Sequence, residues 1–239
     1  MLTFQQISSK VLFIDIETVR QKPTWHELNE MTQRLWERKA QSIGKADCTP
    51  AEKYEQLAAI YAEFGKIICV SMGFLYSKQN QIFFKLKSIF HREEAILLKE
   101  LQTLLDAKFS CWLLCAHNGK EFDYPYLCRR FIVNQIPIPS ILDLQNKKPW
   151  EIPHLDTLEM WKFGDKKAFT SLELLCHIFD IPTPKSDMSG ADVNHIFWNE
   201  NDLLKIARYC EKDVVATAQV LLKMNMLPLI PQENILSEL

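Results

Sequence analysis

Two acidic side chains, Asp15 and Glu17, lie near the end of the apolar run 11–18. Because alternate side chains of a β-strand point to the same face, both carboxylates would share one face, with the intervening apolar side chains in a core on the other. Acids this close together are unfavourable in a buried strand, since burial and mutual repulsion oppose their charged forms. A bound divalent cation would relieve both costs; the alternative is that the two acids cap a helix or lie in a solvated turn.

Two further stretches supply acids that could complete a metal site. Asp123 follows the apolar segment 111–116, and Asp213 lies in the helical pattern 201–223. Tyr209 precedes Asp213 by four residues, so the two share a helix face. Taken singly, Asp123 is typical of a helix N-cap, Asp213 of a solvated acid, and Tyr209 of a packing residue. Their combination with the two acids of the first strand favours a functional cluster.

The composition is that of a soluble globular protein large enough for a substantial core. The 239 residues are 47% hydrophobic and 24% charged, with a net charge of −2 and a pI of about 6.3, and we expect one domain over 1–239. This balance argues against a protein that coats nucleic acid by bulk charge, but permits an enzyme that holds a few nucleotides.

The sequence has neither an apolar run of membrane length nor an amino-terminal signal segment. We therefore expect a cytoplasmic protein without membrane association. The seven cysteines lie mostly in apolar runs and include no Cys-x-x-Cys pair, which predicts reduced core thiols rather than a zinc site.

The order of the apolar patterns predicts an α/β protein with a mixed sheet flanked by helices. A first strand over about 10–17 is followed by a helical insertion over about 20–64, either a packed structural element or a flap over a substrate. The remaining expected elements are a strand over 67–76, a strand over 81–87 in an antiparallel hairpin with it, a helix over 91–108, a buried strand over 111–116, a helix through 127–131, a short strand over 141–144, helices over 155–162, 171–179 and 191–198, and a last helix over 201–223.

The acidic stretches are expected to be neighbours in space. Ligands of open α/β sheets gather at the carboxyl ends of strands. Asp15 and Glu17 lie at such an end, and so does the segment after Ala116 that contains Asp123.

With these motifs the chain resembles the DEDD superfamily of 3′–5′ exonucleases over about residues 11–220. The likeness is to the proofreading domain of family B DNA polymerases and to a bacterial group of stand-alone relatives. Histidine-bearing members place His five residues before the last acid, where this chain has Arg208, so the tyrosine-bearing subgroup is favoured. The segments that carry the resemblance are Asp15-Ile-Glu17-Thr18, Phe64-Gly-Lys-Ile-Ile-Cys-Val-Ser71, Asn118-Gly-Lys-Glu-Phe122-Asp123, Trp161-Lys-Phe-Gly164 with Ser171-Leu172, and Tyr209-Cys-Glu-Lys-Asp-Val214.

The resemblance implies a ribonuclease H-like fold and hydrolysis with two divalent ions, Mg²⁺ or Mn²⁺. Asp15, Glu17 and Asp213 would hold the ion that carries the attacking water. Asp15 and Asp123 would hold the second ion, beside the leaving 3′ oxygen. Tyr209 would orient the water rather than ionise, because a phenol with a pKa of about 10 is a poor base at neutral pH.

The expected substrate is the 3′ end of single-stranded nucleic acid, DNA rather than RNA, with release of nucleoside 5′-monophosphates. Thr18, Asn118 and Phe122 are candidates to hold the terminal nucleotide, Phe122 by stacking, although Phe122 fits a core equally well. A non-catalytic nucleic-acid-binding domain of the same fold is the second hypothesis, disfavoured because it would not need a repulsive acid cluster. A third hypothesis keeps the chemistry but changes the substrate to RNA, as in a 3′–5′ exoribonuclease, or to small nucleotides. We expect no attached polymerase domain, so that any role in proofreading or DNA repair would be in trans.

Three other polar residues are better explained by local structure. Asp156 is expected to cap the helix that follows it. His117 is expected to be a hydrogen-bonded residue near the core, and Lys185 a solvated loop lysine rather than a phosphate ligand.

Overall fold

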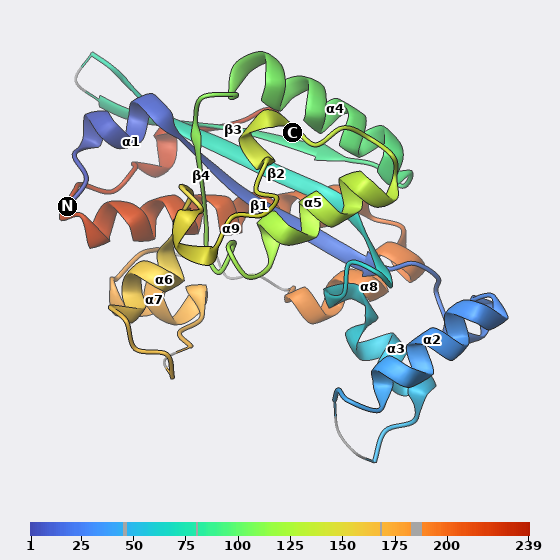
Figure 1. Ribbon diagram of the computed structural model, residues 1–239. Helices are drawn as coiled ribbons and strands as arrows, with labels where there is room; N and C mark the ends of the chain where they lie inside the picture. Colours follow the sequence, from blue (N-terminus) through green and yellow to red (C-terminus); the bar gives the residue numbers. More distant parts are fainter. Residues whose placement is uncertain (45–46, 80, 168, 183–187) are drawn as a thin grey trace.

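A six-stranded sheet with helices on both faces forms the protein (Figure 1). The computed structural model describes residues 1–44, 47–79, 81–167, 169–182 and 188–239, so Lys185 lies outside the described residues. The strand order is β5-β4-β1-β2-β3-β6. The strands are β1 (Val11–Arg20), β2 (Gly65–Lys78), β3 (Gln81–Phe90), β4 (Leu113–Ala116), β5 (Leu155–Asp156) and β6 (Ile235–Ser237).

The helices account for most of the remaining described residues. The α-helices are α1 (Phe4–Lys10), α2 (Glu30–Ala40), α3 (Pro50–Leu57), α4 (Glu94–Lys108), α5 (Asp123–Val133), α6 (Thr157–Lys162), α7 (Leu172–Ile178), α8 (Val193–His195) and α9 (Leu203–Met224). Short 3₁₀ turns are η1 (Trp25–Glu27), η2 (Ala58–Ile60), η3 (Ser140–Leu142), η4 (Pro149–Glu151), η5 (Gly190–Asp192) and η7 (Gln232–Asn234), and η6 (Ile196–Glu200) is π-helical. In the described residues no helix is both long and apolar enough to cross a membrane.

The sheet is mixed, as the element order predicts. β1 pairs antiparallel with β2 and parallel with β4, and β2 and β3 form the predicted antiparallel hairpin. The described pairing of β1 with β4 covers only Val11–Phe13. The part of β1 that carries both acids therefore has an open edge on this side.

Alternation along β1 places its side chains on two faces. Leu12, Ile14 and Ile16 pack in a core with α4 and α5, while Val11 and Phe13 pack with α1 and α9. In Figure 1, α9 runs along one face of the sheet and α4 and α5 cover the other. The odd-numbered acids of β1 consequently lie on the α9 side.

The insertion after β1 has a small core of its own. Trp36 and Tyr54 are fully buried, and the Trp36 indole N–H donates to the Pro50 carbonyl at 2.7 Å. The hydroxyls of Thr18 and Tyr126 both donate to the Ala59 carbonyl, at 2.9 and 2.8 Å. These bonds tie the end of the insertion to β1 and α5, as expected for a packed structural element.

Several sequence-based boundaries are wrong. The strand expected over 141–144 is the turn η3, because Leu142 N–H donates to the carbonyl of Pro139 in a proline-rich segment that has no strand partner in the described residues. The helix expected from residue 155 begins at Thr157, since Leu155 and Asp156 pair with β4 as β5. The helix expected over 191–198 is divided into η5, α8 and η6, while α1 and β6 were not expected.

All seven cysteines are free thiols. Cys69, Cys115, Cys176 and Cys210 are buried as predicted. The prediction of core cysteines is wrong for Cys111, which is exposed because it precedes β4 rather than lying within it.

Candidate active site

Four carboxylates from three distant segments lie near one another around β1. β1 contributes Asp15 and Glu17, the first turn of α5 contributes Asp123, and α9 contributes Asp213. The negative charges of the other three all act on Asp15, as expected of neighbours in space. The structure thus brings together the four acids that the sequence proposes as metal ligands.

Burial and mutual repulsion both oppose the charged forms of these acids. Burial, followed by the neighbouring acids, raises the pKa of Asp15 and of Glu17 well above the usual range. Burial raises the pKa of Asp123 to about 7 and that of Asp213 to about 6. Within the described parts of the chain, none of the four forms an ion pair.

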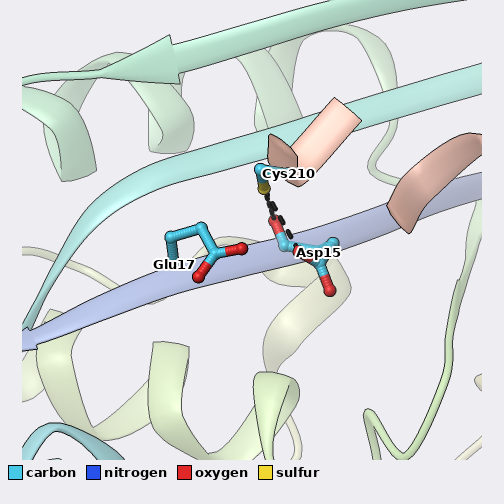
Figure 2. A group of neighbouring side chains, drawn as sticks. All are labelled: Asp15, Glu17 and Cys210. Carbon is cyan, nitrogen blue, oxygen red and sulfur yellow. Dashed lines mark hydrogen bonds between the residues drawn. The ribbon is translucent and has the colours of Figure 1, made fainter. Parts of the chain in front are cut away.

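The sulfur of Cys210 lies against the acids of β1 (Figure 2). One ligand atom each of Asp15, Glu17 and Cys210 lies within 4.8 Å of the others. The Cys210 thiol donates to Asp15 Oδ2 at 3.2 Å and also contacts the Asp15 carbonyl oxygen at 3.4 Å. Burial raises the pKa of this thiol well above its usual value, so in the absence of a metal Cys210 is a neutral donor to Asp15.

The sequence by itself predicts Cys210 only as one of the reduced core thiols. The sequence did contain a signal for its contact with Asp15. Cys210 precedes Asp213 by three residues, so the two side chains lie on the same face of the helix. A thiol on that face, where the acids converge, is close enough to donate to one of them.

Asp123 is held at the open edge of β1. Its carboxylate accepts hydrogen bonds from its own backbone N–H and from that of Ile16, which lies beyond the part of β1 paired with β4. The α5 N-cap position is Phe122, so Asp123 is the first residue of the helix rather than its N-cap. The short β4 strand therefore allows a residue outside the sheet to reach the acids of β1.

Asp156 positions the loop that leads to Asp123. Its side chain caps α6 as predicted, accepting from Leu158 N–H at 2.9 Å. It also accepts from the backbone N–H groups of Asn118 and Lys120, each at 3.0 Å. One buried carboxylate thus joins the start of α6 to the loop between β4 and α5, a second role that sequence reasoning missed.

Close packing restricts the same loop. A Cβ atom at Gly119 would lie 2.4 Å from the Ala116 Cβ and 2.9 Å from the Tyr124 ring, so only glycine fits. Asn118 adopts a left-handed backbone with φ 63°, which asparagine tolerates well. His117 is hydrogen-bonded as predicted, with Nδ1 2.9 Å from the Thr157 hydroxyl and Nε2 3.0 Å from the Thr170 carbonyl.

Tyr209 is hydrogen-bonded to Asp213 one helical turn away. Its hydroxyl donates to the Asp213 carboxylate, a bond that partly offsets the rise in the pKa of Asp213. Burial and then the charges of Asp213, Glu17 and Asp15 raise the pKa of Tyr209 above its ordinary value. The phenol therefore stays protonated at neutral pH.

The three residues proposed to hold the nucleotide differ in their availability. Thr18 is nearly buried, and its hydroxyl already donates to Ala59. Phe122 is half-buried and packs against the core beside Tyr126, with ring centroids 5.4 Å apart. Asn118 is half-buried in the loop before Asp123, with its backbone N–H held by Asp156. Of the three, Asn118 has the side chain most free to contact a ligand.

The donor set of the acid cluster suits hard divalent cations. Carboxylate oxygens are the ligands that Mg²⁺ and Mn²⁺ prefer, and four carboxylates lie here beside the Cys210 thiol. Excess negative charge without an ion-pairing partner in the described residues is the arrangement that a dication stabilises. The residues present therefore fit a divalent metal site.

Comparison with known proteins yields one family and one fold. The model of a family described as a predicted 3′–5′ exonuclease related to the exonuclease domain of PolB matches residues 60–230. A solved family B DNA polymerase from the hyperthermophilic archaeon Pyrobaculum calidifontis has a similar fold, with a TM-score of 0.57 and 12% sequence identity. The similarity covers 91% of this chain and only 24% of the polymerase. No curated protein matches.

The residues matched by the family model include part of the candidate site. The matched range contains Asp123, Tyr209 and Asp213 but not Asp15 and Glu17, which lie before residue 60. The two acids of β1 join the other three residues through the tertiary structure.

Proposed function

Because the chain belongs to the family of predicted 3′–5′ exonucleases related to the exonuclease domain of PolB, we propose that it shortens single-stranded nucleic acid from its 3′ end. The proposed substrate is DNA in preference to RNA, and the products are nucleoside 5′-monophosphates. Hydrolysis would depend on divalent metal ions held by a DEDD site of the tyrosine-bearing type.

The convergence of four carboxylates, two of them buried (Glu17 and Asp123) and two half-buried (Asp15 and Asp213), is the observation that carries this proposal. Holding four like charges together in a largely desolvated place, without an ion-pairing partner in the described residues, lowers stability, so a structural role does not explain the cluster. The fold similarity to a family B polymerase is consistent with a nuclease domain, although that likeness concerns fold alone.

Asp15, Glu17, Asp123 and Asp213 would hold two divalent ions, Mg²⁺ or Mn²⁺. Bound there, the ions would lower the pKa of a coordinated water and offset the charge of the phosphodiester as its bond to the 3′ oxygen breaks. The charges of the other three acids all raise the pKa of Asp15, so a cation bound at this carboxylate would relieve the repulsion among all four.

The chain's own donors would orient the reacting groups. Tyr209 keeps its proton and would align the attacking water by hydrogen bonding from beside Asp213. Cys210 would hold one oxygen of Asp15, leaving the other for a metal. Asn118, Thr18 and Phe122 would lie against the terminal nucleotide, with the Asn118 amide as the polar contact.

Labelled oligonucleotides test this proposal. With Mg²⁺ or Mn²⁺, we expect a 5′-labelled single strand to shorten stepwise, and a 3′-labelled strand to release its label as a mononucleotide at once. EDTA should stop both reactions. Tyr209→Phe should reduce the rate only partly, because the four acids remain.

A surface acid provides the control. Glu100 is exposed and lies 3.8 Å from Lys87 in a surface ion pair, so Glu100→Gln should digest at the wild-type rate. Intact DNA and RNA after incubation with Mn²⁺ would overturn the enzymatic proposal. Digestion of RNA alone would retain the chemistry and overturn the proposed substrate.

A further inference from the structure

Two large aromatic side chains project into solvent between α6 and α7. Phe163 is 91% exposed and Phe169 is 69% exposed. The short helices α6 and α7 bury their own apolar side chains against α9, so neither Phe163 nor Phe169 contributes to that packing. We call residues 162–169, apart from the undescribed residue 168, the aromatic–basic segment.

The backbone at Phe163 is unfavourable for a bulky residue. Phe163 ends α6 with φ 45°, in the left-handed region where glycine is the usual residue, and Gly164 follows with φ 87°. An exposed phenylalanine at this position stabilises neither the helix end nor a core. Its benefit must come from a contact that is made in solvent.

The same segment concentrates positive charge. Lys162, Lys166 and Lys167 are set against the single acid Asp165, in a chain whose net charge is −2. Asp165 accepts from the backbone N–H of Lys167, and none of the three ammonium groups forms an ion pair with another described residue. Exposed aromatic rings beside unpaired cations are suited to bases and phosphates.

Hydrogen bonds connect this segment to the candidate active site. Asp156 caps the start of α6 and holds the loop before Asp123, and α6 is only about 9 Å long at 1.5 Å per residue. At the other end of the segment, the Thr170 carbonyl is 3.0 Å from His117 Nε2. Figure 1 shows α6 and α7 together at one side of the loop that joins β4 to α5.

The pKa shifts of two nearby residues are consistent with the aromatic–basic segment lying close to the candidate active site. Burial lowers the pKa of His117, and the positive charge of Lys162 adds to that shift. Burial raises the pKa of Cys176 in α7 to about 11, and the charge of Asp213 contributes to the rise. Lys162 is therefore near His117 in the loop before Asp123, and α7, which follows the aromatic–basic segment, is near Asp213.

We infer that the aromatic–basic segment binds the single strand a few nucleotides away from its 3′ end, with bases on Phe163 and Phe169 and phosphates on the three lysines. This inference rests on the proposed function, since it assigns the segment to the same strand that the acid cluster cleaves. Local binding of this kind needs no basic surface over the whole protein, which fits the chain's near-neutral charge.

A second exposed aromatic provides a matched control. Trp150 is 77% exposed, with Lys148 Nζ 5.4 Å from its ring, so it is also an aromatic beside a lysine. It precedes β5, at the amino end of that strand, whereas the acids gather at the carboxyl ends. Trp150→Ala should leave strand binding unchanged.

Binding is measured first without catalysis, by fluorescence anisotropy of a 5′-labelled 12-nucleotide oligo(dT) in EDTA. Phe163→Ala and Phe169→Ala should each weaken binding about tenfold, as expected for the loss of one stacked base. Phe163→Trp should restore it. Changing all three lysines to alanine should reduce the slope of log K against log salt by about 2, at about 0.7 per phosphate contact.

Folding is followed by thermal unfolding of the same variants. Phe163→Asn suits the left-handed backbone better, so its unfolding midpoint should equal or exceed that of the wild type while its binding falls. Unchanged binding in both Phe→Ala variants, or an equal loss in Trp150→Ala, would overturn the inference. Self-association that depends on Phe163, without an effect on oligo(dT), would also overturn it.

Cleavage then separates this inference from the proposed function. On the 12-nucleotide substrate in Mg²⁺, Phe163→Ala should raise KM about tenfold with little change in kcat. A dinucleotide too short to reach the segment should be cleaved at the wild-type rate. If no substrate is cleaved but the binding losses occur, the proposed function fails while the assignment of the binding surface stands.

Discussion

Two places where the protein buries charge differ in how that charge is balanced. In the first, Arg130 donates two hydrogen bonds to Glu94, and both residues are nearly inaccessible to solvent. Glu94 also accepts from the Ile67 N–H at 2.7 Å and from Asn134 at 2.8 Å, and Arg130 donates to the Ala62 carbonyl at 2.7 Å. In the second place, the acid cluster, four like charges have no ion-pairing partner among the described residues.

The Glu94–Arg130 pair stabilises the fold, whereas the acid cluster destabilises it when no cation is bound. The Glu94–Arg130 pair joins α4, α5, the start of β2 and the end of the insertion, so it stabilises their packing. The acid cluster lowers stability in the absence of a cation, and such a cost is typical of functional sites. Substitutions in the two places should therefore have opposite consequences.

The largest expected effect is on catalysis and comes from Asp15→Asn. Loss of this central carboxylate should reduce exonuclease activity on the order of a thousandfold or more, because it removes a ligand needed for charge stabilisation. The unfolding midpoint without metal should stay equal or rise, since one repelling charge is gone. Digestion rates and thermal melts of the same sample check both; a large loss of stability would contradict the comparison.

Next in size is the destabilisation by Glu94→Ala. It leaves Arg130 buried and unpaired, which should lower the free energy of unfolding by about 3–5 kcal/mol. Urea denaturation measures the loss. The double variant Glu94→Leu with Arg130→Met should be closer to the wild type, because it removes both charges, and activity per folded molecule should persist in both. A double variant no better than Glu94→Ala would show that the ion pair is not the cause.

A smaller effect is expected on the pH dependence of stability in EDTA. The pKa of Asp123 is raised to about 7 and that of Asp213 to about 6, while unfolded aspartates titrate at about 3.9. Between these values the folded state binds more protons than the unfolded state. The stability that protonation provides is therefore lost as pH rises through about 6 to 7.

Thermal unfolding at pH 6 and at pH 8 tests whether stability falls as pH rises. The wild-type midpoint should be higher at pH 6, and the difference between the two pH values should shrink in Asp123→Asn. Mg²⁺ or Mn²⁺ at pH 8 should restore the midpoint by binding the folded state. A metal-induced rise of the same size in the double variant Asp15→Asn with Asp213→Asn would contradict a metal site in the cluster.

The smallest effect concerns Cys210. Replacing it with alanine removes the donor to Asp15 Oδ2, and a lost hydrogen bond of about 1.4 kcal/mol corresponds to a rate about tenfold lower. Cys210→Ser should recover most of the rate by restoring a donor. The concentration of Mg²⁺ needed for half-maximal activity should rise in Cys210→Ala. Wild-type rates and metal dependence in that variant would show that Cys210 only fills space.

Local patterns were sufficient to find most of the sheet and the acids. The period of two in β1 placed Asp15 and Glu17 on one face, and the spacing of four placed Tyr209 beside Asp213 on α9. The ends of helices and strands were predicted less well where tertiary packing overrides the local secondary-structure preference of the residues. Residues 155–156 pair as a strand because β4 lies beside them, and no feature of those two residues alone indicates this.

Sequence by itself determined which residues could form the acid cluster, because strand and helix periodicities are local properties of the chain. Only the tertiary structure decided what holds the cluster in place. The short pairing of β4 leaves the Ile16 N–H open to Asp123, Asp156 fastens the loop before that acid, and Cys210 reaches Asp15 across about 200 residues of sequence. These contacts join segments far apart in the chain, and their geometry depends on how whole elements pack.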